Sequence, residues 1–314
     1  MNRPGVSRGS LNSLGKNRLG RLLTAMVTPF DAQGEVDYKQ AKRLALSLLD
    51  SGSNGVVISG TTGECPTLSK EEKLRLFAET KSALGNRGTV VAGTGSYNTK
   101  ESQELTKEAE KTGVDACLLV VPYYNKPTQQ GLWEHFKVIA ESTTLPCILY
   151  NVPSRTVTNL AADTVIKLSQ IDNIVGVKEA SGDLGQIAEI IQETREDFLV
   201  YSGNDSDTFP ILALGGYGVI SVAAHLVGIQ IKEMMEKFLN GKPQEAAEIH
   251  RHLLPLIDAL LIVPNPMPVK WALNYVGFPV GKPRLPLIEP DEKSADLIQA
   301  TLKNYKIDLS IPKG

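Results

Sequence analysis

The 314 residues of this chain are 42% hydrophobic and 22% charged, the composition of a soluble globular protein with enough apolar material for a sizeable core. The 33 basic and 35 acidic residues are interspersed, and the formal net charge of −2 argues against a nucleic-acid partner. No apolar stretch reaches the ~20 residues that a transmembrane helix requires, so the sequence also argues against a membrane protein.

The first 20 residues differ in composition from the rest of the chain, because they contain basic residues but no acidic residue. We interpret residues 1–20 as a disordered N-terminal extension. An organelle transit peptide is the alternative, but the segment is short and has no amphipathic face.

From residue 21 to residue 227, short β-branched apolar runs alternate with longer amphipathic segments, which is typical of repeated strand–helix units around a parallel sheet. Eight such strands in strict alternation predict an α/β fold, the (β/α)8 TIM barrel. The strand-like runs are Leu23–Thr28, Gly55–Ser59, Thr89–Ala92, Ala116–Val121, Cys147–Tyr150, Ile174–Lys178, Phe198–Ser202 and Gly218–Val222.

The intervening segments have the periodicity and end signals of helices. Ser69 followed by Glu72 is a capping box, which predicts that a helix begins there. After the eighth strand, helical patterns cover Gly228–Asn240, Gln244–Ile262 and Asp291–Tyr305, separated by proline-rich breaks at Pro264–Pro268 and Lys282–Pro290. We therefore expect residues 228–314 to form a C-terminal helical extension packed on the barrel.

Lys178 ends an apolar run that reads as a buried strand, and the carboxyl ends of barrel strands are where such folds carry their function. A lysine amine removed from water favours its uncharged form, which can attack a carbonyl and form a Schiff base. The alternative is a lysine at a strand end whose stem is buried and whose ammonium reaches water.

Other polar side chains follow the predicted strands at the same rim. Thr61 and Thr62, within Gly60–Glu64, offer two hydroxyls and backbone N–H groups that suit a small carboxylate. A nucleotide-binding loop is disfavoured, since no Gly-Lys-Ser/Thr follows. Tyr150 suits a proton shuttle bonded to Thr61 or Tyr124; the alternative is an aromatic barrel residue whose hydroxyl contacts water.

Arg155 follows the fifth predicted strand and could clamp a carboxylate through two parallel hydrogen bonds, whereas an isolated loop arginine is usually a surface residue. A catalytic metal is not expected. The histidines lie mostly in helix-like stretches, and the cysteines lack Cys-x-x-Cys spacing, so we expect reduced thiols in a cytoplasmic protein. The histidines are His135, His225, His250 and His252, and the cysteines are Cys65, Cys117 and Cys147. Asp205 and Asp207 are the carboxylates that could indicate a metal site.

Four motifs, in order and spacing, resemble those of the dihydrodipicolinate synthase family, within the pyruvate-dependent lyases that include N-acetylneuraminate lyase. The resemblance covers almost everything from Leu22 onward. The motifs are Gly60–Glu64, Tyr150–Thr156, Gly176–Ala180 and Pro264–Lys270.

The resemblance implies that Lys178 forms a Schiff base with pyruvate and that no further cofactor is needed. It implies a proton relay of Thr61, Tyr150 and Tyr124, the last from a neighbouring subunit, and hence a homo-oligomer, commonly a dimer of dimers. It further implies that Thr62 holds the pyruvate carboxylate, that Gly203 and the Ile220 carbonyl line the pocket, and that Arg155 binds the carboxylate of aspartate semialdehyde.

The resemblance also implies an effector site for lysine at the dimer interface. Glu101 and Tyr123 match inhibited members, but Lys70 and Lys73 stand where those members often carry histidine, and Tyr97 replaces an asparagine. Two ammonium groups oppose a cationic effector, so we expect weak or absent feedback by lysine. Micromolar inhibition in a steady-state assay would contradict this expectation.

The leading functional hypothesis is therefore a synthase that condenses pyruvate with aspartate semialdehyde, in diaminopimelate and lysine biosynthesis. The first alternative is a pyruvate lyase of the same superfamily acting on a sugar acid, for which a carboxylate clamp at Arg155 has no use. A non-catalytic carboxylate-binding regulator is the second alternative, and the presence of Lys178, both tyrosines and Thr61 argues against it.

Overall fold

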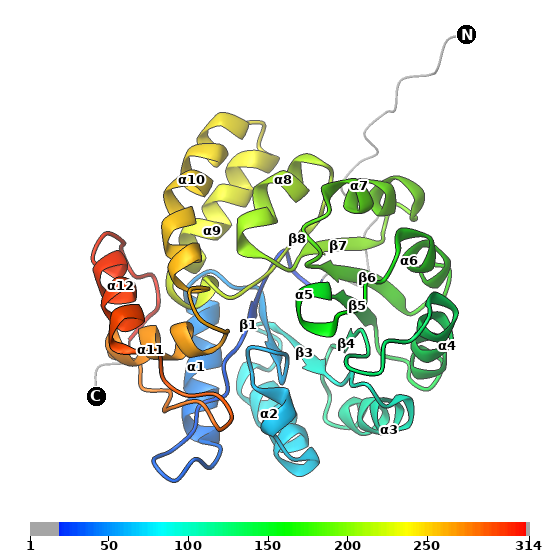
Figure 1. Cartoon of the computed structure of the whole chain (residues 1–314), viewed down its shortest axis with the longest axis horizontal. Helices are drawn as coiled ribbons and strands as arrows, with labels where there is room; N and C mark the ends of the chain where they lie inside the picture. The colour runs from blue at the N-terminus through cyan, green and yellow to red at the C-terminus, as the bar shows by residue number, and fades with distance from the viewer. Residues whose placement is uncertain (1–18, 312–314) are drawn as a thin grey trace.

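The computed structural model describes residues 19–311, which fold into a closed barrel of eight parallel strands surrounded by helices (Figure 1). Each strand pairs with the next in the sequence, and β1 pairs with β8 to close the ring. The predicted (β/α)8 barrel is confirmed. Its strands are β1 (Leu22–Ala25), β2 (Gly55–Ile58), β3 (Thr89–Gly93), β4 (Ala116–Val120), β5 (Cys147–Asn151), β6 (Ile174–Glu179), β7 (Leu199–Ser202) and β8 (Gly218–Ser221).

Five of the helices between the strands begin at a polar residue whose side chain accepts a backbone N–H of the first turn. Ser69 accepts a hydrogen bond from the Glu72 backbone and Glu72 accepts one from the Ser69 backbone, so the predicted capping box of α2 is present. The barrel helices are α1 (Tyr38–Asp50), α2 (Lys70–Leu84), α3 (Thr99–Glu110), α4 (Gln129–Ala140), α5 (Pro153–Thr156), α6 (Ala162–Leu168), α7 (Leu184–Glu193) and α8 (Thr208–Ala213), with 3-10 turns η1 (Cys65–Thr67) and η2 (Asp205–Asp207).

The apolar side chains form two packed layers. One fills the inside of the barrel, where Leu23, Val91 and Ile148 meet, and the other lies between the strands and the outer helices. The strands pack closely: a Cβ added to Gly176 would lie 2.3 Å from the Leu199 carbonyl oxygen. Only glycine therefore allows β7 to approach β6 at this point.

The C-terminal region consists of α9 (Ala224–Leu239), α10 (Pro243–Ala259), α11 (Met267–Tyr275) and α12 (Glu292–Leu302). In Figure 1 these helices gather on the side of the barrel where α1 lies, and α9 contacts both α1 and β1. Helix α11 was not predicted, because Pro264–Pro268 fits a break in the helical pattern. Proline is compatible with the first turn of a helix, and Pro268 occupies that position.

Residues 1–18 and 312–314 lie outside the described part, and with them nearly all of the predicted N-terminal extension. Among the helices that the structure describes, none combines the length and the apolar character needed to cross a bilayer.

His225, in the first turn of α9, is fully buried as a neutral imidazole. Its Nε2 accepts the Val27 N–H at 3.2 Å, and its Nδ1 donates to the Val222 carbonyl at 2.8 Å. Burial lowers the pKa of His225 to about 4 from 6.5. The unfolded chain takes up the proton first, so this group's contribution to stability is intact above about pH 6.5 and is lost as pH falls toward 4, by about 3 kcal/mol.

We expect urea unfolding between about pH 7 and pH 4 to show this loss. His225→Gln, whose amide can form both hydrogen bonds without titrating, should show a shallower decline in the free energy of unfolding. Equal declines in the two proteins would exclude His225 as a source of acid sensitivity.

Candidate active site

Lys178 and Tyr150 face one another inside the barrel at the carboxyl ends of neighbouring strands. They are register partners on β6 and β5, and each is only 5% exposed. The Lys178 Nζ lies 4.2 Å from the centre of the Tyr150 ring. The lysine is therefore buried against an aromatic face, and the alternative of an ammonium extended to water does not describe this side chain.

The loop that carries Thr61 and Thr62 follows β2 and is held in an unusual backbone conformation. Ser59 and Glu64, at its two ends, have positive φ angles of 56° and 57°. The Thr28 hydroxyl donates to the Gly63 carbonyl at 2.7 Å. Thr62 is buried, whereas Thr61 is half-buried. The loop thus presents both hydroxyls from a constrained backbone.

Arg155 lies in the one-turn helix α5, within the ring of outer helices in Figure 1, and its side chain is exposed. The segment is anchored at both ends by Asn151, whose Oδ1 accepts the Leu160 N–H at 2.9 Å and whose Nδ2 donates to Glu179 at 3.0 Å. Burial raises the pKa of Glu179. No acidic side chain of residues 19–311 forms an ion pair with Arg155, so its cation, on an anchored loop, is available to an anionic ligand.

Gly203 and Ile220 border the same end of the barrel. The Gly203 N–H donates to the Glu179 carbonyl at 2.7 Å, and a Cβ at Gly203 would lie 2.7 Å from the Ala180 Cβ. Ile220 is fully buried on β8, where it pairs with Leu23 of β1. Gly203 is thus a place where a side chain would disturb the packing beside Lys178.

Asp205 has a structural role of which the sequence gives no sign. Its carboxylate accepts the Val222 and Ala223 N–H groups at 2.9 and 3.0 Å and also bonds the Ser221 hydroxyl, while burial raises its pKa. These bonds anchor the end of β8. Among residues 19–311, no group of three or more histidine, cysteine, aspartate or glutamate side chains could hold a metal ion.

Tyr124 points away from its own chain, with 91% of its side chain exposed and a positive φ of 73°. Within residues 19–311, no hydrogen bond joins the hydroxyls of Tyr124, Tyr150 and Thr61. The adjacent Tyr123 is half-buried and packs edge-on against Tyr97, with ring centres 5.1 Å apart, and burial raises the pKa of Tyr123 to about 12. Tyr124 is thus an exposed aromatic side chain next to the packed pair of Tyr97 and Tyr123.

The residues of the expected effector site lie on α2 and α3 and on the loops before α3 and α4. Lys70 forms an ion pair with Glu108 at 2.5 Å, and this hydrogen bond raises the pKa of Lys70. Glu101 lies in the first turn of α3, and Lys73 is half-buried on α2. Because Glu108 partly offsets the charge of Lys70, the repulsion expected for a cationic effector rests mainly on Lys73.

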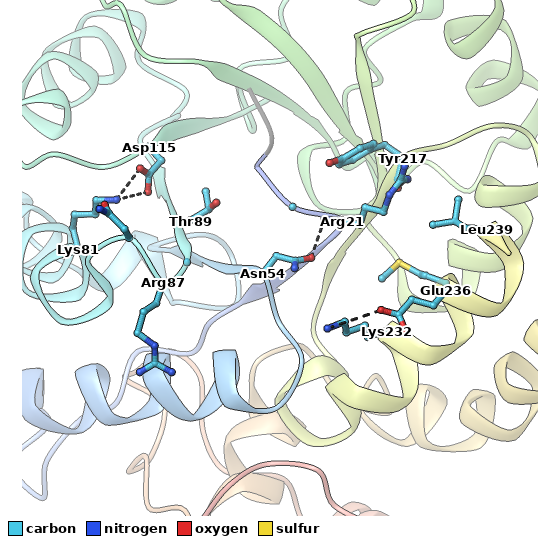
Figure 2. A pocket seen from close by; sticks show the side chains of 14 residues that line it. Arg21, Asn54, Lys81, Arg87, Thr89, Asp115, Tyr217, Lys232, Glu236 and Leu239 are labelled. Carbon is cyan, nitrogen blue, oxygen red and sulfur yellow. Dashed lines mark hydrogen bonds and ion pairs between the residues drawn. The ribbon is translucent and has the colours of Figure 1, made fainter. Parts of the chain in front are cut away.

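A cavity of about 550 Å³ lies at the opposite end of the barrel, beside residues that precede or begin strands (Figure 2). Asn54, Thr89, Asp115 and Tyr217 line it. Lys81 pairs there with Asp115 at 2.7 Å, whereas the Arg21 guanidinium lies over the Tyr217 ring, 4.4 Å from its centre. Barrels of this type carry their active sites at the other end, where Lys178 lies, so we do not assign the active site to this cavity.

The fold and the buried lysine–tyrosine pair at the carboxyl ends of its strands define a barrel enzyme, a lyase of the class I aldolase type. The chain belongs to the dihydrodipicolinate synthetase family, whose model matches residues 18–305. The resemblance inferred from the four motifs is confirmed.

Individual relatives agree with this assignment. The 4-hydroxy-tetrahydrodipicolinate synthase of Dehalococcoides mccartyi is 66% identical over 293 residues, which cover 93% of this chain and 99% of that protein. The structure of dihydrodipicolinate synthase from Bacillus anthracis is 46% identical with a TM-score of 0.89, covering 94% of this chain and 99% of that chain. The Cyanidioschyzon merolae enzyme, solved with lysine bound, is 46% identical with a TM-score of 0.91, covering 92% and 99%.

Proposed function

We propose that this chain is a 4-hydroxy-tetrahydrodipicolinate synthase, which condenses pyruvate with L-aspartate 4-semialdehyde. The burial of Lys178 against Tyr150 carries the proposal, because it unites a candidate nucleophile and a candidate proton carrier in one water-poor site. The names of the relatives, at up to 66% identity, support the same substrates.

Lys178 attacks the keto carbon of pyruvate and water leaves, giving an imine. The imine withdraws electrons, so the pyruvate methyl loses a proton and becomes an enamine carbon, which attacks the aldehyde of aspartate semialdehyde. The amine of that substrate then displaces Lys178, which closes the ring and frees the enzyme. The imine nitrogen accepts the electron pair that remains when the methyl group loses its proton, so the reaction needs no other electron acceptor.

The other residues at the carboxyl ends of the strands have roles that follow from the chemistry of their side chains and backbone. Tyr150, Thr61 and Tyr124 pass protons to and from the imine, and Thr62 with Thr61 holds the pyruvate carboxylate. Gly203 and the Ile220 carbonyl line the space beside Lys178, where the packing at Gly203 admits no side chain. Arg155 binds the carboxylate of aspartate semialdehyde.

The exposure of Tyr124 supports a homo-oligomer in which this residue completes the site of a neighbouring subunit, as a dimer of dimers. Feedback by lysine is weak or absent in this proposal, because Lys73 opposes a cationic effector. A cytoplasmic location suits the buried thiols Cys117 and Cys147, which are unpaired although their strands are adjacent.

Borohydride reduction with pyruvate, followed by peptide mass mapping, tests the proposal directly. The expected result is a single pyruvyl adduct, on the peptide that contains Lys178. An adduct on another lysine, or catalysis with no trapped adduct, would contradict the assigned nucleophile.

Arg155→Ala separates the two substrates in the proposed reaction. Loss of a charge-assisted bidentate contact should raise the KM for aspartate semialdehyde by about 10- to 100-fold, while borohydride trapping of pyruvate is unchanged. Steady-state kinetics with each substrate varied in turn provide the measurement. Unchanged kinetics would remove Arg155 from the mechanism, whereas turnover of N-acetylneuraminate or a keto-deoxy sugar acid by the unmodified protein would favour the sugar-acid alternative.

A further inference from the structure

The chain contains a second buried lysine that the proposed reaction does not use. Lys270 of α11 forms an ion pair with Glu64 at 2.8 Å, and both side chains are fully buried. The Lys270 Nζ also donates to the carbonyls of Thr28 and Lys282, each at 3.0 Å, and lies 4.1 Å from the centre of the Phe30 ring. Every hydrogen of this ammonium therefore has a partner among described groups.

Glu64 ends the loop that presents Thr61 and Thr62. Its backbone has the left-handed conformation, with φ of 57°, and its second carboxylate oxygen accepts the Arg284 N–H at 2.8 Å. Burial lowers the pKa of Lys270 to about 8, against the attraction of Glu64. A buried carboxylate in this backbone conformation is thus tied at both oxygens to the C-terminal region.

Two further hydrogen bonds join the same loop to the same network. The Asn265 Nδ2, just before α11, donates to the Thr62 hydroxyl oxygen at 2.9 Å. Thr28 bonds the loop through its hydroxyl, which donates to the Gly63 carbonyl, while its own carbonyl accepts from Lys270. The loop is therefore held by side-chain hydrogen bonds at three consecutive residues, Thr62, Gly63 and Glu64.

Stability alone is a poor explanation for such a pair, since a buried ion pair contributes little compared with apolar side chains of similar volume. What the fully bonded pair of Glu64 and Lys270 does supply is one defined geometry. We propose that Glu64, Lys270 and Asn265 are positioning residues, which orient the Thr61 and Thr62 hydroxyls toward the carboxylate of the keto acid bound at Lys178. The inference rests on the proposed roles of Thr61 and Thr62, and it makes the C-terminal extension part of the catalytic apparatus.

The test requires a variant that removes the network without leaving a buried charge. Lys270→Met alone strands the Glu64 carboxylate, so the double variant Lys270→Met with Glu64→Gln is the informative one. In it the glutamine oxygen can still accept the Arg284 N–H. Asn265→Ala weakens the same loop without any change of charge. Lys81→Met is the matched control, because it breaks the pair with Asp115 at the opposite end of the barrel.

In the full-length oligomer, we expect the double variant and Asn265→Ala each to raise the pyruvate concentration needed for half-maximal borohydride trapping by about tenfold or more. The KM for aspartate semialdehyde should change by less than about twofold. Lys81→Met should lower the melting temperature while its trapping curve matches that of the unmodified protein. A structural role alone would move the melting temperature without this selective effect on pyruvate.

Thr62→Val identifies which proposal fails if the result is negative. Suppose that Asn265→Ala and the double variant both need the same pyruvate concentration for half-maximal trapping as the unmodified protein, while Thr62→Val is impaired in trapping. This result overturns the positioning role alone. If Thr62→Val shows the same pyruvate dependence of trapping as the unmodified protein, the assigned role of Thr62 is overturned and the inference with it. If the double variant does not fold, Asn265→Ala decides the question by the same measurement.

Discussion

Replacing Lys178 by methionine is expected to abolish the condensation, lowering kcat by more than about 10⁴-fold, because the proposed covalent bond to pyruvate forms through the Lys178 amine. Methionine keeps an unbranched stem that can fill the space beside Tyr150. The variant should therefore fold and assemble normally. The measurement is the initial rate of condensation, together with the absence of any borohydride-trapped pyruvyl adduct.

Lys81→Met is the control for this change as well, since the same substitution at the far end of the barrel should leave the rate unchanged. Size-exclusion chromatography and thermal melting must show that the Lys178 variant remains folded. Condensation at a normal rate by Lys178→Met would remove the covalent mechanism altogether.

Tyr124→Phe should lower kcat by about 10²- to 10³-fold, because it removes one hydroxyl from a proton relay without removing aromatic packing. The side chain is 91% exposed in its own chain, so this loss should occur in trans, at the site of a neighbouring subunit. The oligomer should persist, since phenylalanine retains the ring. The measurement is kcat, with the oligomeric state checked by light scattering.

Complementation distinguishes action in trans from action within one chain. A Lys178→Met subunit paired with a Tyr124→Phe subunit recreates one intact site, because each supplies what the other lacks. Random co-assembly of the two inactive chains should then restore about a quarter of the unmodified activity. If co-expression restores nothing while mixed oligomers form, Tyr124 does not act across the interface.

Local sequence patterns predicted the barrel because each pattern identifies one strand or one helix from the residues of that segment alone. The β-branched runs identify strands by their burial on both faces, and Ser69 with Glu72 begins α2 by bonds three residues apart. Closure of the ring followed from the number of units. Pro264–Pro268 misled us for the same reason, since its prolines fit either a break or a first helical turn, and local sequence does not distinguish the two.

Much of the candidate site also follows from the sequence, because a barrel brings the carboxyl ends of all its strands to one rim. That rule grouped Lys178 with Tyr150 before any distance was known, and their facing arrangement agrees with it. The proposed hydroxyl relay depends on a second chain as well, because the position of Tyr124 relative to another subunit is set by the assembly and not by the fold of one chain.

The sequence by itself determined the order of strands and helices and the residues at the ends of the strands, since both depend on short-range periodicity. Only the tertiary structure decided which distant residues support them: Asn265 meets Thr62 across 203 positions, and Lys270 meets Glu64 across 206. A lysine among apolar neighbours on α11 gives no sign of its partner in the sequence. The pairing arises when helix packing removes both charges from water, so that each is stable only beside the other.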